Sequence, residues 1–185
     1  MKITLTSVRL SFPALFEPKA GPDGGAPKYS AAFIIEPGSK NAKALKDACA
    51  AVANEKWGAK AAGTMKELYA KDKVCYKENE KANSSGDVYA GFEGMHFVNT
   101  SNKARPTVVD ADKSPLTAQD GKPYGGCYVN AIIDIWPQDN GYGKRVNATL
   151  MGVQFVKDGD AFVGGTPASP DDFDVVAGAD AEDLA

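Results

Sequence analysis

The sequence predicts a mainly β protein in which a small barrel or closed sheet packs against one principal helix. Three observations support this fold class. Several short segments alternate apolar and polar residues as half-buried strands do, one segment of about four turns has helical spacing, and strands and helices do not alternate regularly as in parallel α/β folds. The 185 residues suit a single domain. This pattern favours a barrel and leaves a β-sandwich open.

The first 36 residues are predicted to form two strands separated by a loop. KITLTSVRL alternates apolar and polar residues, with an irregularity near Ser7. SFPALFEPKAGPDGGAP, which follows directly, holds four prolines and three glycines in 17 residues. That composition argues against a helix or a central strand and predicts a loop. KYSAAFIIE then resumes as a strand.

The principal helix is predicted in SKNAKALKDACAAVANEKWG. Its apolar positions lie at helical spacing, Ser39 can cap its start and Gly58 can end it. A shorter helix is predicted in TMKELYAK, where Thr64 and Glu67 have the spacing of a capping box.

Beyond these helices the pattern predicts short strands in VCYK, MHFVNTS and RPTVVD, and then two long strands. In GGCYVNAIIDIW, one predicted face carries Tyr128 and Trp136, and the other carries the apolar set Cys127, Val129, Ala131, Ile133 and Ile135. PQDNGYGK has the composition of a turn, and RVNATLMGVQFV returns as a strand. The two long strands are therefore predicted to form a hairpin.

Charge is distributed unevenly along the chain. Residues 158–185 contain eight acids and no Lys or Arg, whereas the other 157 residues contain all 21 bases and 16 acids. The body therefore carries a formal charge of +5 and the C-terminal segment −8. Such asymmetry is typical of a body that binds a polyanion and a tail that takes part in interactions. The last residues show no periodicity, which predicts a disordered tail.

The sequence argues against several other classes of protein. No apolar run has the length of a signal peptide core or of a membrane span, so a soluble, cytoplasmic protein without membrane contact is expected. The motifs of serine hydrolases, zinc proteases, P-loop enzymes and dinucleotide-binding enzymes are absent from the sequence. A zinc site formed by the three cysteines with His96 is disfavoured, because zinc ligands usually come in closely spaced pairs. No cofactor is expected.

Four acids, Asp110, Asp112, Asp134 and Asp139, could hold Mg²⁺ as a nuclease site does. They lie in or beside predicted turns, where Asp is favoured for local hydrogen bonding. The turn interpretation is therefore preferred, and a non-enzymatic protein is expected.

Aromatic and basic residues are interleaved in segments that are expected to be exposed, while Phe33, Phe92, Phe97 and Phe155 are assigned to the core. Bases of single-stranded nucleic acid stack on aromatic rings, and Lys and Arg contact the phosphates. Trp136, at the end of its strand, is the strongest stacking candidate. The candidate binding residues are Lys28, Tyr29, Tyr76, Lys77, Lys103, Arg105, Tyr124, Tyr128, Trp136, Tyr142, Lys144 and Arg145.

YVNAIIDIWPQDNGYGKRVNATLMGVQFVKDGDAF resembles a family of bacteriophage single-stranded DNA-binding proteins, and VRLSFPALFEP and RPTVVD are also similar to that family. The resemblance implies an OB-fold over residues 1–165 and sequence-independent binding of single-stranded DNA during phage replication, recombination or repair in an infected bacterium. A phage structural or accessory protein, in which the same aromatic residues form a protein interface, is the alternative.

The resemblance also suggests a role for the acidic tail, residues 166–185. Related phage and bacterial proteins use acidic C-termini to recruit replication proteins and to compete with DNA for the basic groove. The residues expected to take part are Asp171, Asp172, Phe173, Asp174, Asp180, Glu182 and Asp183.

Overall fold

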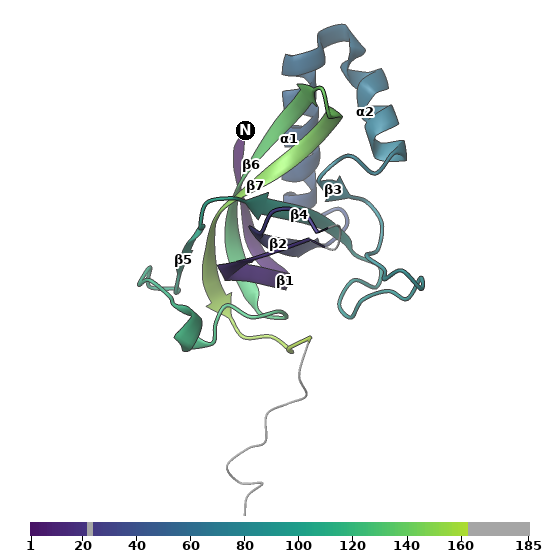
Figure 1. The fold of residues 1–185 in the computed structure, drawn as a ribbon. Helices are drawn as coiled ribbons and strands as arrows, with labels where there is room; N and C mark the ends of the chain where they lie inside the picture. Colours follow the sequence, from purple (N-terminus) through teal and green to yellow (C-terminus); the bar gives the residue numbers. More distant parts are fainter. Residues whose placement is uncertain (22–23, 163–185) are drawn as a thin grey trace, which may run out of the picture.

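A computed structural model describes residues 1–21 and 24–162 of the chain (Figure 1). Its elements are β1 (Lys2–Lys19), β2 (Lys28–Ile35), α1 (Lys40–Trp57), the short 3₁₀ helix η1 (Gly58–Lys60), α2 (Ala61–Ala70), β3 (Tyr76–Lys77), β4 (His96–Asn102), β5 (Thr107–Val109), the 3₁₀ helix η2 (Ala118–Asp120), β6 (Tyr128–Asn140) and β7 (Gly143–Lys157). No helix in the described ranges is long and apolar enough to cross a membrane.

Five of the strands close into a barrel in the order β1-β2-β4-β7-β6, and β6 pairs again with β1. The closing contact is a parallel bridge between Ser101 of β4 and Thr149 of β7, whereas the other barrel pairs are antiparallel. β3 extends the sheet beyond β4, and β5 pairs with β7. The predicted fold class, an OB-fold-like small barrel with a principal helix, is confirmed, and the sandwich alternative is excluded.

The barrel interior is filled by the alternate apolar positions of its strands. All five apolar positions of the predicted inner face of β6, from Cys127 to Ile135, have no exposed surface. Phe33, on β2, is equally buried, and the three other phenylalanines assigned to the core are at most 8% exposed. Burial of one such large apolar side chain stabilises the fold by about 1.5 to 3 kcal/mol.

Helix α1 starts and ends where the sequence predicts. The Ser39 hydroxyl accepts a hydrogen bond of 3.2 Å from the amide of Ala42, and Gly58 ends the helix with a φ of 53°. Leu45 and other apolar residues of α1 pack against the barrel core. The predicted capping box at Thr64 is wrong: α2 follows η1 directly and begins at Ala61, so Thr64 lies inside the helix. Both helices connect β2 to the short strand β3.

The loop predicted over residues 11–27 is partly wrong, because β1 continues to Lys19. Its pairing with β2 shifts register between Ser11 and Ala14 and again between Ala14 and Lys19. Pro13 and Pro18 lie at these two irregularities, where a missing backbone N–H does not interrupt a regular ladder. The irregularity predicted near Ser7 is confirmed, since the pairing of β1 with β6 shifts between Leu5 and Val8.

The hairpin predicted from the two long strands is confirmed, but its turn is shorter than predicted. The β6–β7 ladder continues to the pair Asn140 and Gly143, which leaves only Gly141 and Tyr142 in the turn. The ends of β6 and β7 therefore form a two-stranded arm that runs alongside α1 (Figure 1). The Trp57 indole of α1 donates a hydrogen bond of 2.8 Å to Asp139, which ties the arm to the helix.

Candidate nucleic-acid interface

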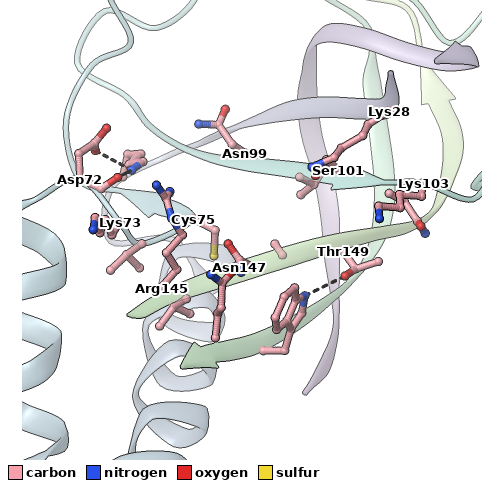
Figure 2. A pocket seen from close by; sticks show the side chains of 18 residues that line it. Lys28, Asp72, Lys73, Cys75, Asn99, Ser101, Lys103, Arg145, Asn147 and Thr149 are labelled. Carbon is pink, nitrogen blue, oxygen red and sulfur yellow. Dashed lines mark hydrogen bonds and ion pairs between the residues drawn. The ribbon is translucent and has the colours of Figure 1, made fainter. Parts of the chain in front are cut away.

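A groove of about 890 Å³ crosses the outer surface of the barrel where β4 meets β7. Its walls come from the start of β2, from residues 72–77, which end in β3, and from the β6–β7 arm. Figure 2 shows Asn99 and Ser101 of β4 on one side of the groove and Arg145, Asn147 and Thr149 of β7 on the other.

The groove carries a concentration of positive charge. Its lining holds five basic residues, which are Lys28, Lys73, Lys77, Lys103 and Arg145, and one acid, Asp72. Asp72 is paired with Lys77 at 2.5 Å. The other four bases form no ion pair with any residue in the described ranges. A polyanion that enters the groove would therefore meet basic side chains that no carboxylate of the described ranges already neutralises.

Neutral polar side chains form the floor of the groove because of strand alternation. On β7, Arg145, Asn147 and Thr149 point outward while the residues between them are buried. On β4, Asn99 and Ser101 alternate with buried neighbours in the same way. The closing bridge between β4 and β7 places these two polar rows side by side. They offer donors and acceptors to phosphates, sugars or bases.

Trp136 lies where β6 leaves the barrel for the arm, and it lines the groove. Its side chain is 39% exposed, which is uncommon for a tryptophan in a folded domain. The indole N–H donates a hydrogen bond of 2.9 Å to the Thr149 hydroxyl, which fixes the ring edge. The fixed, partly exposed ring is suited to stack on a planar ligand.

Five of the twelve candidate binding residues line the groove: Lys28, Lys77, Lys103, Trp136 and Arg145. These residues come from β2, β3, β4, β6 and β7 or from the ends of those strands.

Four other candidates do not line the groove. Tyr29 is half-buried on β2, opposite Asn102. Tyr142 is 91% exposed at the tip of the arm. Lys144 has its Nζ 5.9 Å from the centre of the Trp57 ring, and Arg105 has its Cζ 5.7 Å from the centre of the Phe16 ring.

Tyr124 and Tyr128 belong to the opposite end of the barrel. Tyr128 begins β6, eight residues before Trp136, so the two residues are roughly 27 Å apart at about 3.4 Å per residue. The Tyr124 hydroxyl donates a hydrogen bond of 2.7 Å to Asp158. Burial, and then this carboxylate, raise the pKa of Tyr124. The structure does not bring these two rings to the groove.

The assignment of Tyr76 to DNA stacking is corrected by its burial. Its side chain is fully buried in the core, and its hydroxyl is hydrogen-bonded to His96 Nδ1 at 2.8 Å. Desolvation raises the pKa of Tyr76 to about 12. A ring in this position presents no face to a base.

Replacing Tyr76 with Phe is expected to lower the free energy of unfolding by about 0.5 to 1.5 kcal/mol, because the hydrogen bond to His96 is lost. Affinity for single-stranded DNA should not change. Denaturant unfolding and oligo-dT titration of the same preparation check both expectations. A stable variant with weakened DNA binding would show that Tyr76 takes part in DNA binding after all.

The sequence reasoning missed Lys73, Asn99, Asn147 and Thr149, all of which line the groove. A signal for the last two was present, because RVNATL alternates polar and apolar residues and places both on the face of Arg145. No local pattern indicated Lys73, which lies between α2 and β3.

The metal-site alternatives find no support in the described ranges. Those residues contain no group of three or more His, Cys, Asp or Glu side chains that could hold a metal ion. Asp110 pairs with Lys122 at 2.8 Å, and this hydrogen bond holds the pKa of the Asp110 carboxyl below its usual value. The three cysteines are buried and form no disulfide.

The expected domain boundary at residues 165 and 166 and the acidic residues of the C-terminal segment lie outside the described residues. The candidate residues of this segment are Asp171, Asp172, Phe173, Asp174, Asp180, Glu182 and Asp183.

Comparison with known proteins relates the chain to phage proteins. The family model described as the single-stranded DNA-binding protein of Enterobacter phage Enc34 matches residues 1–185. Protein p50 of Acyrthosiphon pisum secondary endosymbiont phage 1 is 45% identical over 188 residues, which cover 100% of this chain and 98% of p50.

Solved structures agree with this relation. The bacteriophage Enc34 single-stranded DNA-binding protein, solved in complex with single-stranded DNA, matches with a TM-score of 0.65 and 27% identity, over 88% of this chain and 89% of that one. The single-stranded DNA-binding protein gp2.5 of bacteriophage T7 matches with a TM-score of 0.57 over 91% of this chain and 98% of gp2.5. At 13% identity, the match to gp2.5 indicates a shared fold alone.

Proposed function

Because the chain belongs to the family of the Enterobacter phage Enc34 single-stranded DNA-binding protein, we propose that it binds single-stranded DNA in the groove between β4, β7 and the arm. The family consists of binding proteins and not of enzymes. The observation that carries the proposal is that one groove on the barrel holds a partly exposed tryptophan together with four basic side chains that form no ion pair among the described residues.

The position of the groove on the barrel supports this proposal. OB-folds bind oligonucleotides on the face of their second and third strands and on the loops that join strands one to two and four to five. Here the second and third barrel strands are β2 and β4, and the last connection is the β6–β7 arm. Lys28, Ser101 and Arg145 line the groove from these three elements.

The proposed mode of binding combines phosphate contacts with stacking. Lys28, Lys73, Lys103 and Arg145 contact successive phosphates, and Trp136 stacks on a base. Every base has a π-face, so this mode is tolerant of sequence. We assign the protein a role in coating single strands during phage DNA replication, recombination or repair in the infected cell.

Oligonucleotides with and without bases provide the test. Fluorescence anisotropy should give similar affinities for oligo-dT and oligo-dC and an affinity about ten times weaker for an abasic strand of equal length, which keeps the phosphates but cannot stack. Absence of binding to all three strands would contradict the proposal and favour a protein interface.

The acidic segment 166–185 is proposed to compete with DNA for the groove and to recruit replication proteins. It contains six acids and no base, and the rest of the chain is net positive. About 20 residues span at most roughly 66 to 72 Å when fully extended, at about 3.3 to 3.6 Å per residue. Trp136 in the groove lies roughly 27 Å from Tyr128, which pairs with Lys157 near the end of the described residues. The segment is therefore long enough to reach the basic groove.

Deleting residues 166–185 is expected to tighten the binding of oligo-dT at about 50 mM salt and to have a smaller effect at about 300 mM, where charges are screened more strongly. The same deletion should abolish binding of replication proteins. Titrations of both proteins at both salt concentrations check the first expectation. Identical affinities at the lower concentration would contradict competition, and aggregation of the shortened protein would instead indicate a role in solubility.

A further inference from the structure

A second group of exposed aromatic side chains lies outside the groove. Phe12, in β1, is 48% exposed, and Tyr89, in the segment between β3 and β4, is 36% exposed. Their ring centres are 4.9 Å apart in an edge-to-face arrangement. Both rings rest on Phe92, which is fully buried and packs edge-on against Phe97 of β4. We call Phe12 and Tyr89 the aromatic platform.

The platform has a basic residue beside it. Lys81 has its Nζ 5.7 Å from the centre of the Phe12 ring and 4.9 Å from that of Phe97. It forms no ion pair with any residue in the part of the chain that the structure describes. Burial, and then the charge of Lys77, lower the pKa of Lys81. An approaching anion would stabilise its ammonium group.

The platform continues the surface of the groove. Phe97 lies on the same face of β4 as Asn99 and Ser101, which line the groove, and Asn99 follows at roughly 7 Å along the strand. Lys77 pairs with Phe97 across β3 and β4 and also lines the groove. A strand that leaves the groove along β4 therefore meets Lys81 and the platform next.

The backbone of Phe12 is held in a conformation that is unusual for a large side chain. Its φ is 47°, in the left-handed region that bulky residues rarely adopt. Strain of this kind persists only where the surrounding structure imposes it, and it is frequent at binding sites. Leu10 and Leu15 on either side of it in β1 are buried, whereas the Phe12 ring is turned outward.

We propose that the aromatic platform is a second stacking site for single-stranded DNA, in which Phe12 and Tyr89 contact bases of the strand that leaves the groove and Lys81 contacts a phosphate. This inference rests on the proposed binding of DNA in the groove. Nucleic acid is the proposed ligand because the platform is continuous with the basic groove and has Lys81 at its edge, which pairs with no carboxylate of the described residues.

Oligonucleotide length separates the two sites. Oligo-dT from about 4 to about 16 nucleotides spans the known site sizes of OB-folds. The double variant Phe12→Leu/Tyr89→Leu keeps apolar volume but loses both rings. It should bind the longest oligonucleotides about ten times more weakly than the unchanged protein and bind the shortest with less than a twofold change. Trp136→Ala should weaken binding at every length.

Tyr69→Leu is the matched control, because Tyr69 is a 39% exposed aromatic on α2 that belongs to neither the groove nor the platform. It should leave all affinities unchanged. If thermal unfolding shows that the double variant is unfolded, Lys81→Gln replaces it and should reduce the salt dependence of binding for long oligonucleotides only.

An unchanged affinity for long oligonucleotides, or an equal loss at every length, would overturn the second site. Loss of self-association without a change in DNA affinity would show that the platform is a protein interface, which also overturns it. If Trp136→Ala has no effect at any length, the groove proposal fails, and this outcome is distinct from failure of the platform.

Discussion

Replacing Trp136 with Ala is expected to weaken the binding of oligo-dT by about 1 to 3 kcal/mol while the barrel stays folded. The ring is 39% exposed, lines the groove and is held at its edge by Thr149. Its removal takes away a stacking surface and little core packing. Anisotropy titration gives the change in affinity, and thermal unfolding checks the fold.

Trp136→Phe is the control for stacking, since it keeps a π-face and loses the hydrogen bond to Thr149. It should retain most of the affinity. A large drop in the unfolding temperature of Trp136→Ala would instead place the residue in the core. Equal losses of affinity for the Phe and Ala variants would indicate that the hydrogen bond, and not stacking, supports binding.

Raising salt from about 50 to about 200 mM is expected to weaken binding roughly 50-fold. Four bases of the groove form no ion pair within the described ranges and correspond to about four phosphate contacts. Each contact contributes about −0.7 to the slope of log K against log salt for a single strand. Arg145→Gln should make that slope shallower by about 0.7. An interface made mainly of apolar contacts with a protein would show little dependence on salt.

The control for Arg145→Gln is Lys144→Gln, because Lys144 directly precedes Arg145 on β7 and does not line the groove. It should leave the slope nearly unchanged. A shallower slope for Lys144→Gln together with an unaltered slope for Arg145→Gln would place the phosphate path on the other face of the arm.

Elements with a repeating local pattern could be predicted from the sequence. The inner face of β6, with Ile133 and Ile135, follows from strict alternation, and α1 follows from helical spacing between Ser39 and Gly58. The prolines of residues 11–27 predict a loop, because proline is normally excluded from a central strand. The barrel accommodates Pro13 and Pro18 at shifts of register, which composition does not reveal.

The candidate site could be predicted only in part, because local sequence does not fix which face of a short strand is buried. Tyr76 and Trp136 are both aromatic residues near basic ones, yet Tyr76 is fully buried in a two-residue strand while Trp136 is partly exposed. Asn99 and Asn147 line the same groove only because β4 pairs with β7 when the barrel closes. Contacts between positions so far apart carry no local signal.

The two tryptophans, Trp57 and Trp136, allow the central claim to be tested by fluorescence. In Trp57→Phe, all tryptophan emission comes from Trp136, the residue proposed to stack on a base. Addition of oligo-dT should quench this emission strongly, with the same midpoint as the anisotropy titration. In Trp136→Phe, the remaining emission of Trp57 should change little while DNA still binds. Saturable binding of oligo-dT to Trp57→Phe without a change in Trp136 emission would contradict the assignment of the groove as the path of the single strand.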